Sequence, residues 1–358
     1  MSRLIRAVID TQALRHNLNV IRARAGRANV IAVVKANAYG HGLVSAALAI
    51  QDAGAFAVAR LEEGMSLRAA GITSRIVVLE GVFSRSQLED AAQEKLDLVV
   101  HDPSQIELLE KTGGGERFAL WLKVDTGMNR LGFATEDFAR ALERVRDLPT
   151  PARELRLMTH LACADERDGI VTGEQLARFR EVTRGLNYET SIANSAGLLG
   201  GIATTSHWVR PGIALYGASP FGDTRAADFG LKPVMTLVST VLTLRHVRRG
   251  ERVGYGGAWT APRDARIAII AAGYGDGVPR SFEMGTPVLV RGARASLVGR
   301  VSMDMIAVDV TGISGVEVGT SAVLWGEGLP VEEVARHAGT IPYELLCSVS
   351  QRVPLEPH

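Results

Sequence analysis

Eight short apolar runs, each followed by a segment of helical pattern, occupy the chain from Asn29 to about Gly217. Strict alternation of strand and helix predicts an α/β fold with a parallel sheet. Eight such repeats favour a closed (β/α)8 barrel of the TIM type, and an open doubly wound sheet is the alternative. The expected strands are Val30–Lys35, Ala55–Arg60, Arg75–Glu80, Leu96–His101, Phe118–Asp125, Leu155–Leu161, Tyr188–Ala193 and His207–Val209.

Helices are expected between these strands, and Ser104 and Thr135 are the expected caps of two of them. An additional strand, Arg3–Ile9, and a helix, Asp10–Ala25, come before the barrel. The expected barrel helices are His41–Asp52, Leu61–Ala70, Arg85–Gln93, Ser104–Lys111, Thr135–Arg146 and Gly173–Leu186.

The pattern changes after about Phe229, where Val, Thr and Leu become frequent and glycine-containing turns separate short apolar runs. This predicts a mainly β C-terminal domain. The expected strands are Val234–Val247, Arg266–Ala271, Pro287–Val290, Ala295–Val301, Met305–Val310 and Ser321–Leu324. We therefore expect a barrel domain at 1–230 and a β domain at 231–358, joined by a hinge near Pro220–Gly230.

Charge and composition exclude several classes of function. The 358 residues carry a net charge of +1 without a long run of like charge, so no nucleic acid or anionic membrane is an expected partner. The N-terminus has charges where a signal peptide would be apolar, and no apolar run could span a bilayer. Two distant cysteines, Cys163 and Cys347, form neither a disulfide framework nor a metal cluster. We expect a cytoplasmic protein.

Polar residues gather where five predicted strands end. The clearest is Lys35, which ends the apolar run Asn29–Val34. A buried lysine has a lowered pKa and can form Schiff bases, although a lone lysine more often pairs with a carboxylate or extends to the rim. In a barrel these ends form one active face. The other residues there are Lys123, Asp125, Arg130, His160, Asn194, Ser195 and Arg210 to Ile213.

Ser195, at the start of a short helix, and the amides around Gly212 and Ile213 suit an anion, although Ser195 alone is more simply a helix cap. A phosphate site opposite a buried lysine indicates pyridoxal 5′-phosphate. Arg210 could reach the pyridine nitrogen, with His160 placed to orient it. Arginine has no acceptor, so that nitrogen would stay unprotonated and the ring would be a weaker electron sink.

The motif Val34-Lys-Ala-Asn-Ala-Tyr-Gly-His-Gly42 resembles the cofactor-lysine motif of the alanine racemases, which are fold-type III pyridoxal-phosphate enzymes. The resemblance spans the whole chain and is specific as an ordered set. Its further motifs are Trp121–Gly132, Arg210–Gly217, Val253–Gly257, Gly273–Gly277, Gly299–Met305 and Tyr343–Leu346.

The resemblance implies interconversion of L- and D-alanine by two bases in a homodimer with shared active sites. Lys35 would hold the cofactor and act as one base, and Tyr255 of the other subunit would be the second. The phosphate would contact Tyr39, Ser195, Gly212, Ile213 and Tyr343. Arg210, supported by His160, would face the pyridine nitrogen, Arg130 the phenolic oxygen, and Asn194 would lie nearby.

The resemblance also assigns the substrate pocket. Met303 and Asp304 of the partner would line it, together with Arg130, while Tyr274 would narrow its entrance and Arg280 would support a polar network. Lys123 stands where some members carry a carbamylated lysine, which would pair as an anion with Arg130. Without the resemblance, Tyr255 would be read as a turn or packing residue.

Three other functions remain open. A broad-specificity racemase would differ only in the width of its pocket. A fold-type III decarboxylase usually has an acidic partner for the pyridine nitrogen, which Arg210 is not. A non-catalytic pyridoxal-phosphate carrier would resemble the barrel alone. The sequence leaves open whether D-alanine is made for peptidoglycan or consumed in catabolism.

Overall fold

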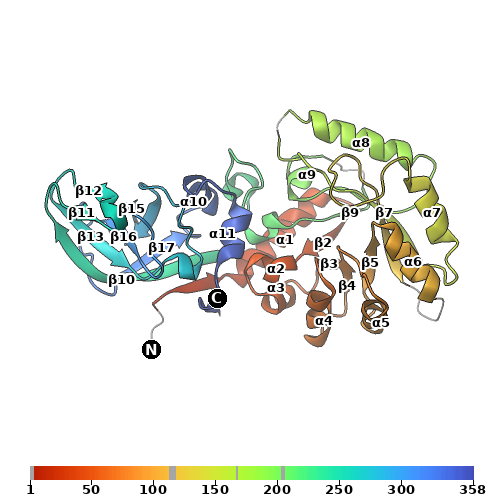
Figure 1. The fold of residues 1–358 in the computed structure, drawn as a ribbon, viewed down its shortest axis with the longest axis horizontal. Coiled ribbons are helices and arrows are strands. Elements are labelled where there is room, and N and C mark those ends of the chain that lie inside the picture. Colours follow the sequence, from red (N-terminus) through yellow and green to blue (C-terminus); the bar gives the residue numbers. More distant parts are fainter. Residues whose placement is uncertain (1–3, 113–117, 167, 203–205) are drawn as a thin grey trace. The chain divides into compact units, whose positions relative to one another are not determined.

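The computed structural model describes residues 4–112, 118–166, 168–202 and 206–358, and the chain divides into two compact units (Figure 1). The barrel unit comprises residues 18–38 and 43–215, and the β unit comprises residues 1–17, 39–42 and 216–358. The first residue of the expected N-terminal strand, Arg3, lies outside the described residues.

The barrel unit contains a closed parallel barrel, as predicted. Its strands pair in chain order, and β9 returns to β2, so the sheet has no free edge. Strands β3 and β5 are buried at every position, as expected of parallel strands covered on both faces. The strands are β2 (Asn29–Val33), β3 (Ala55–Val58), β4 (Arg75–Val78), β5 (Asp97–Val100), β6 (Ala119–Lys123), β7 (Glu154–Met158), β8 (Thr190–Ser191) and β9 (Trp208–Val209).

The barrel helices follow the predicted order, but two predicted caps are wrong. Asp102 caps its helix, because its carboxylate accepts the Ser104 N–H at 2.9 Å, and Ser104 lies inside the helix. Thr135 lies outside the helix that begins at Phe138, and Asp137 takes the cap position of that helix. The helices are α1 (Thr11–Ala25), α3 (Leu43–Ala49), α4 (Leu61–Ala69), α5 (Arg85–Gln93), α6 (Pro103–Thr112), α7 (Phe138–Arg146), α8 (Ile170–Val182) and α9 (Ser195–Leu199), with a 3₁₀ turn η1 at Ile213–Tyr216.

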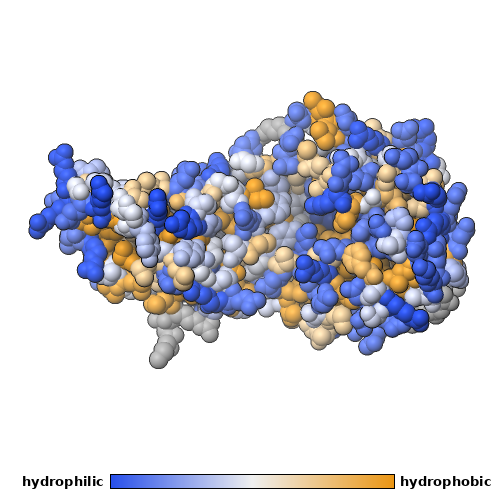
Figure 2. Space-filling model, viewed as in Figure 1, coloured by the Kyte–Doolittle hydropathy of each residue, from blue (hydrophilic) through white to orange (hydrophobic). Residues whose placement is uncertain are grey.

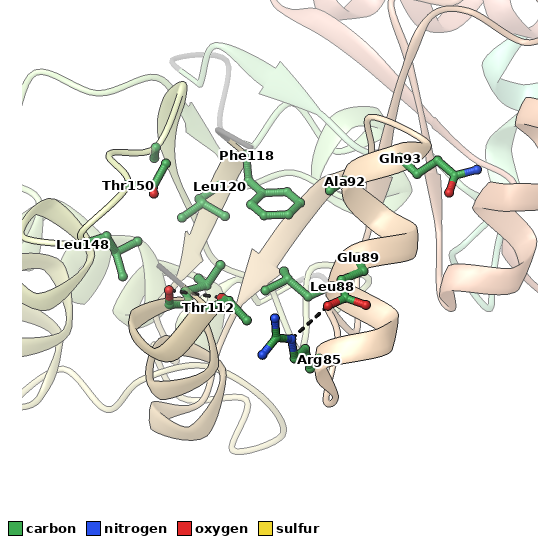
Figure 3. A pocket seen from close by; sticks show the side chains of 12 residues that line it. Arg85, Leu88, Glu89, Ala92, Gln93, Thr112, Phe118, Leu120, Leu148 and Thr150 are labelled. Carbon is green, nitrogen blue, oxygen red and sulfur yellow. Dashed lines mark hydrogen bonds and ion pairs between the residues drawn. The ribbon is translucent and has the colours of Figure 1, made fainter. Parts of the chain in front are cut away.

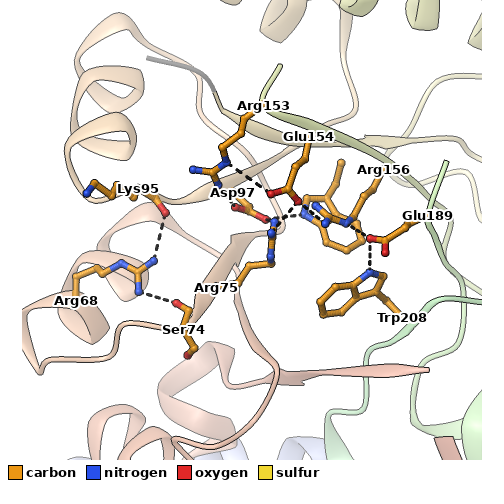
Figure 4. Close-up of polar contacts among 11 residues, drawn as sticks. Arg68, Ser74, Arg75, Lys95, Asp97, Arg153, Glu154, Arg156, Glu189 and Trp208 are labelled. Carbon is orange, nitrogen blue, oxygen red and sulfur yellow. Dashed lines mark hydrogen bonds and ion pairs between the residues drawn. The ribbon is translucent and has the colours of Figure 1, made fainter. Parts of the chain in front are cut away.

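Charged residues close the end of the barrel where the strands begin (Figure 4). Arg75 bridges the buried Asp97 and Glu154, the latter at 2.8 Å. Arg156 lies over the rings of Trp121 and Trp208 and pairs with Glu154 and Glu189. Since each carboxylate here has an arginine partner, this end is electrostatically balanced.

The β unit is built on one long antiparallel strand, β10 (Met235–Val247). It pairs with both β13 and β17, so the strands β10, β13, β16, β15, β14 and β17 form a continuous ring. The first residues of β10 also pair with the N-terminal strand β1 (Arg6–Ile9). Strand β1 in turn pairs with the C-terminal strand β18 (Leu355–Pro357). Both ends of the chain thus join this sheet.

The remaining elements of the β unit confirm the mainly β prediction and add two helices. They are β11 (Arg252–Val253), β12 (Trp259–Thr260), β13 (Ala265–Ile270), β14 (Pro287–Val290), β15 (Ala293–Val298), β16 (Ile306–Asp309), β17 (Ser321–Trp325), α10 (Val331–His337) and α11 (Pro342–Ser348), with 3₁₀ turns η2 (Ala226–Phe229), η3 (Tyr255–Gly257) and η4 (Tyr274–Asp276).

The segment expected as a hinge is held within the β unit. The carboxylate of the buried Glu332 in α10 accepts the N–H groups of Ser219 and Ala226, both at 2.8 Å. At Gly217, with φ +71°, a Cβ would lie 1.7 Å from the carbonyl oxygen of Lys232, so this position requires glycine.

Hydrophobic and hydrophilic side chains are interspersed on the face drawn in Figure 2. Along the described ranges, no helix combines the length and apolar character needed to cross a membrane.

Candidate active site

A left-handed turn directly after Lys35 carries the chain away from the end of the first barrel strand. The expected loop is α2 (Lys35–Tyr39), in which Ala36, Asn37, Ala38 and Tyr39 all have φ between +52° and +54°. Each such residue costs about 1–2 kcal/mol, so the surroundings must hold the turn. Glu63 accepts the Ala36 N–H at 2.7 Å, and Asn37 accepts the Leu43 N–H at 2.8 Å.

Arg210, which follows β9, is fully buried and fixed at several points. It donates to Ser191 Oγ and to the Thr159 carbonyl, both at 2.6 Å, and to the Ile192 carbonyl at 3.3 Å. Burial lowers the pKa of Arg210 to about 10, which leaves the guanidinium charged at neutral pH. These partners are neutral, so Arg210 brings an uncompensated positive charge into the barrel unit.

His160 follows β7 and lies against Arg210, with Nδ1 3.3 Å from a guanidinium nitrogen. Burial, and then the charges of Arg210 and Lys123, lower the pKa of His160 well below its usual range. A neutral imidazole can accept a hydrogen bond from Arg210 at Nδ1, which is the contact that the predicted support of Arg210 by His160 requires.

Lys123 ends β6 and shares this cationic environment. Burial lowers its pKa to about 8, and the positive charges of Arg210, Arg130 and Lys35 act in the same direction. The nearby carboxylate, Asp125, opposes the effect. At pH 7 about a tenth of the Lys123 side chains are then neutral amines, far more than for an exposed lysine.

Asp125 is largely occupied by its own loop. Its two carboxylate oxygens accept the N–H groups of Gly127, Met128, Asn129 and Arg130 at 2.8 to 3.1 Å. The loop thus presents the exposed Arg130 at a fixed place beyond β6. Because Asp125 is occupied by these backbone amides, the lysines and arginines of the site keep an excess of positive charge.

Ser195 is not the cap of its helix. Asn194 holds that place, since its side-chain oxygen accepts the Gly197 N–H at 2.9 Å. Ser195 Oγ instead accepts the N–H groups of Gly212 at 2.9 Å and Ala214 at 3.3 Å, beside the buried Ile213. A hydroxyl that accepts twice keeps its proton for a further bond, which suits a phosphate oxygen.

In the β unit, Tyr39 lies among aromatic rings. It stacks on Tyr216 with centroids 4.7 Å apart and lies 6.1 Å from the ring of Tyr343, which belongs to α11. Burial, reinforced by Tyr343, raises the pKa of Tyr39, so its phenol stays protonated and can donate a hydrogen bond. A Cβ at Gly40, with φ +83°, would lie 2.1 Å from the Leu346 carbonyl oxygen, so the chain passes α11 in close contact.

Tyr255 lies in η3 between Gly254 and Gly256, and 68% of its surface is exposed. Four further predicted site residues are also exposed in this unit, namely Tyr274, Arg280, Met303 and Asp304. The structure therefore groups these residues in one unit and the cationic residues around Lys35 in the other.

Sequence reasoning missed three contributors. Ser191 and Thr159 bind Arg210, and Tyr216 stacks on both Tyr39 and His41. Tyr216 directly precedes Gly217 in the motif Arg210–Gly217. This aromatic residue inside the motif was the signal that could have identified it.

The donor set fits an anionic, phosphorylated cofactor. It combines an amine at Lys35, two arginines, a hydroxyl proton at Ser195 and excess positive charge. In the described part of the chain, no group of three His, Cys, Asp or Glu side chains could hold a metal ion. A barrel with a lysine-centred anion site and a separate β unit defines a class of two-part barrel enzymes.

Comparison with known proteins identifies the family within that class. Residues 9–220 match the alanine racemase N-terminal domain, and residues 234–356 match the alanine racemase C-terminal domain. The chain belongs to the alanine racemase family.

Relatives of this family match along nearly the whole chain. Alanine racemases of Shewanella baltica and Vibrio parahaemolyticus are 47% and 46% identical, over 99% and 98% of both chains. The solved biosynthetic alanine racemase of Pseudomonas aeruginosa has a TM-score of 0.96 at 46% identity, and the solved alanine racemase of Acinetobacter baumannii has a TM-score of 0.93 at 38% identity. In each case the match covers 100% of both chains.

Proposed function

We propose that this protein interconverts L- and D-alanine with pyridoxal phosphate as its cofactor. The observation that carries the proposal is the cluster of Lys35, Lys123, Arg130 and Arg210, in which burial and then the charges of the other three residues lower the pKa of Lys123. Such a cluster is unfavourable in the free protein and favourable around an anionic ligand. Family membership supplies the reaction.

The predicted site residues would hold the cofactor. Lys35 would carry it, and Arg130 would pair with its phenolic oxygen. Arg210, whose guanidinium contacts His160, would face the pyridine nitrogen. The phosphate would be held by Ser195, by the amides at Gly212 and Ile213, and by Tyr39 and Tyr343, with Asn194 in support.

When bound, the cofactor supplies an electron-withdrawing ring that acidifies the Cα proton of the amino acid. Tyr255 of the other subunit takes this proton from L-alanine, and Lys35 returns one to the other face of Cα; the roles reverse for D-alanine. Arg210 has no hydrogen-bond acceptor and does not readily give up a proton, so the pyridine nitrogen would stay unprotonated. The ring would then be a modest electron sink, which favours rapid return of the proton over decarboxylation.

We propose that residues of both subunits line the substrate pocket. Met303 and Asp304 of the partner line it with Arg130, Tyr274 narrows its entrance, and Arg280 supports the polar groups there. A narrow entrance predicts that kcat/KM for alanine exceeds that for serine and lysine. Comparable values for the three amino acids would instead indicate a broad-specificity racemase.

We further propose a functional division into residues 1–230, which hold most of the cofactor, and residues 231–358, which add Tyr343 to the phosphate site and complete the partner's site. The proposed state is a cytoplasmic homodimer that provides D-alanine for peptidoglycan. The similarity to a biosynthetic enzyme of Pseudomonas aeruginosa supports this direction over catabolism.

Mixing two inactive variants tests the shared site. Lys35→Ala and Tyr255→Ala should each lose racemisation, assayed as D-alanine formed from L-alanine. After the two are unfolded and refolded together in equal amounts, half of the dimers combine both chains and contain one intact site. We expect about a quarter of wild-type activity in the mixture.

The matched control is Tyr188→Phe, because Tyr188 binds Arg146 on the outside of the barrel and should not affect turnover. Activity that stays absent in the refolded mixture, while wild type refolds to full activity, would overturn the shared site. A wild-type enzyme that binds the cofactor but exchanges no Cα deuterium would overturn the racemase function itself.

A further inference from the structure

Arg352, in the turn that follows α11, connects two loops that are distant in sequence. Its Nε lies 2.6 Å from Asp276 Oδ1, and a terminal nitrogen lies 2.7 Å from Asp304 Oδ1. Asp276 ends the turn η4, which contains Tyr274, and Asp304 lies beside Met303. A planar guanidinium can serve two carboxylates at once, which an ammonium group does poorly.

The first loop is fixed by more than this ion pair. Asp276 is 2% exposed, and its other carboxylate oxygen accepts the Gly273 N–H at 2.9 Å. Its backbone carbonyl accepts the Ser350 N–H at 3.1 Å, close to Arg352 in sequence. Asp276 is therefore a rigid anchor for the guanidinium.

The two loops also meet through their backbones. The Tyr274 N–H donates to the Ser302 carbonyl at 3.0 Å, and the Gly275 N–H donates to the Met303 carbonyl at 2.8 Å. A Cβ at Gly273 would lie 2.2 Å from the Met303 carbonyl oxygen. A shift of either loop must therefore move the other.

The tip of the second loop is exposed. Met303 is 54% and Met305 is 41% exposed, and Asp304 is exposed between them. With little side-chain packing at the tip, the ion pair to Arg352 restrains the direction in which Asp304 projects.

We propose that Arg352 is a positioning residue for the substrate site: by holding Asp276 and Asp304 together, it fixes the loop of Met303 and Asp304 against the loop of Tyr274. The proposal rests on the proposed function, in which these three residues line the partner's pocket. Arg352 acts through them and does not touch the substrate.

Steady-state kinetics of the holoenzyme test the role. Arg352→Met should raise the KM for both alanine isomers about tenfold, the loss expected for one charge-assisted contact, with a smaller change in kcat and unchanged cofactor absorbance. Arg352→Lys should recover part of the loss. Arg249→Met removes an exposed arginine from another turn of the unit and should leave KM unchanged.

A double-mutant cycle tests whether Arg352 acts through Asp304, since Asp304→Asn leaves the pair with Asp276 intact; if Arg352→Met folds poorly, Arg352→Lys takes its place in the cycle. In the Asp304→Asn background, Arg352→Met should raise KM less than in wild type. Fully additive losses, or an unchanged KM in Arg352→Met, would overturn the positioning role.

Hydrogen exchange separates this proposal from the proposed function. The amides of Tyr274 and Gly275 should exchange faster in Arg352→Met, and not in Arg249→Met, whatever reaction the enzyme catalyses. Unchanged exchange at these amides would refute the connection between the loops. A wild-type enzyme without racemase activity, but with the expected exchange, would refute the function and retain the connection.

Discussion

Replacing Lys123 with methionine should stabilise the cofactor-free protein at neutral pH. Burial and neighbouring cations lower the pKa of Lys123 from the ordinary 10.5 to about 8. One pKa unit corresponds to about 1.4 kcal/mol, so the charged lysine costs the folded state up to about 3 kcal/mol below pH 8. Methionine fills a similar volume without the charge, so we expect a gain of about 2–3 kcal/mol at pH 7.

The sign of the pH dependence follows from proton binding. Between pH 8 and 10.5 the unfolded chain holds the Lys123 proton more often than the folded chain does. Wild-type stability should therefore rise with pH in this window relative to the Lys123→Met variant. The difference between the two proteins should shrink steadily and vanish above about pH 10.5.

Urea unfolding at a series of pH values, followed by tryptophan fluorescence, measures this difference. The buffers must be free of bicarbonate, because carbamylation of Lys123 would replace the cation by an anion that pairs with Arg130. Adding bicarbonate should then stabilise wild type and leave Lys123→Met unchanged. A variant that is less stable than wild type at pH 7, with a difference independent of pH, would refute the reasoning.

Three further perturbations distinguish stability from function. Asp97→Asn removes the buried member of the two carboxylates that pair with Arg75. It should destabilise the barrel by about 3 kcal/mol in urea unfolding, with kcat/KM retained, because it lies at the end away from the strand carboxyl termini; the exposed-pair variant Glu110→Gln should cost under about 1 kcal/mol. Gly40→Ala puts a methyl group 2.1 Å from a carbonyl oxygen of α11 and should lower the thermal midpoint and the cofactor affinity together; a variant with normal affinity would contradict the close passage. Arg210→Lys loses the forked contacts of the guanidinium, and we expect altered cofactor absorbance and at least tenfold lower kcat; an unchanged spectrum would argue against its place at the pyridine nitrogen.

Much of the barrel could be predicted from the sequence because alternation constrains it. Once eight strands alternate with helices, their carboxyl ends must share one face, and this placed Lys123, His160 and Arg210 together before any side chain was seen. The same logic could not find the partners of Arg210. A serine such as Ser191 and a backbone carbonyl carry no signal until a buried guanidinium lies beside them.

Local signals failed where two conformations compete. Ala36 and Ala38 favour right-handed helix, so their left-handed turn is imposed by tertiary contacts. Asn194 and Ser195 are both good caps, and the sequence cannot say which one caps and which one is left to bind a ligand. Pairing of β1 with β10 joins residues more than 200 positions apart, which periodicity does not detect.

Positive and negative charges balance at one end of the barrel unit, and positive charge is in excess at the other. The residues that stabilise the barrel are therefore different from those proposed to bind the cofactor. Where the strands begin, three arginines, Arg75, Arg153 and Arg156, meet three carboxylates, Asp97, Glu154 and Glu189, and the charges balance.

Where the strands end, lysines and arginines gather around Asp125, whose oxygens already serve four backbone amides. Uncompensated charge is tolerated there because the balanced end and the closed sheet stabilise the barrel independently. An anionic cofactor then binds to groups that are already positioned and whose mutual repulsion it relieves, so its binding should stabilise the barrel unit most strongly below pH 8, where Lys123 is charged.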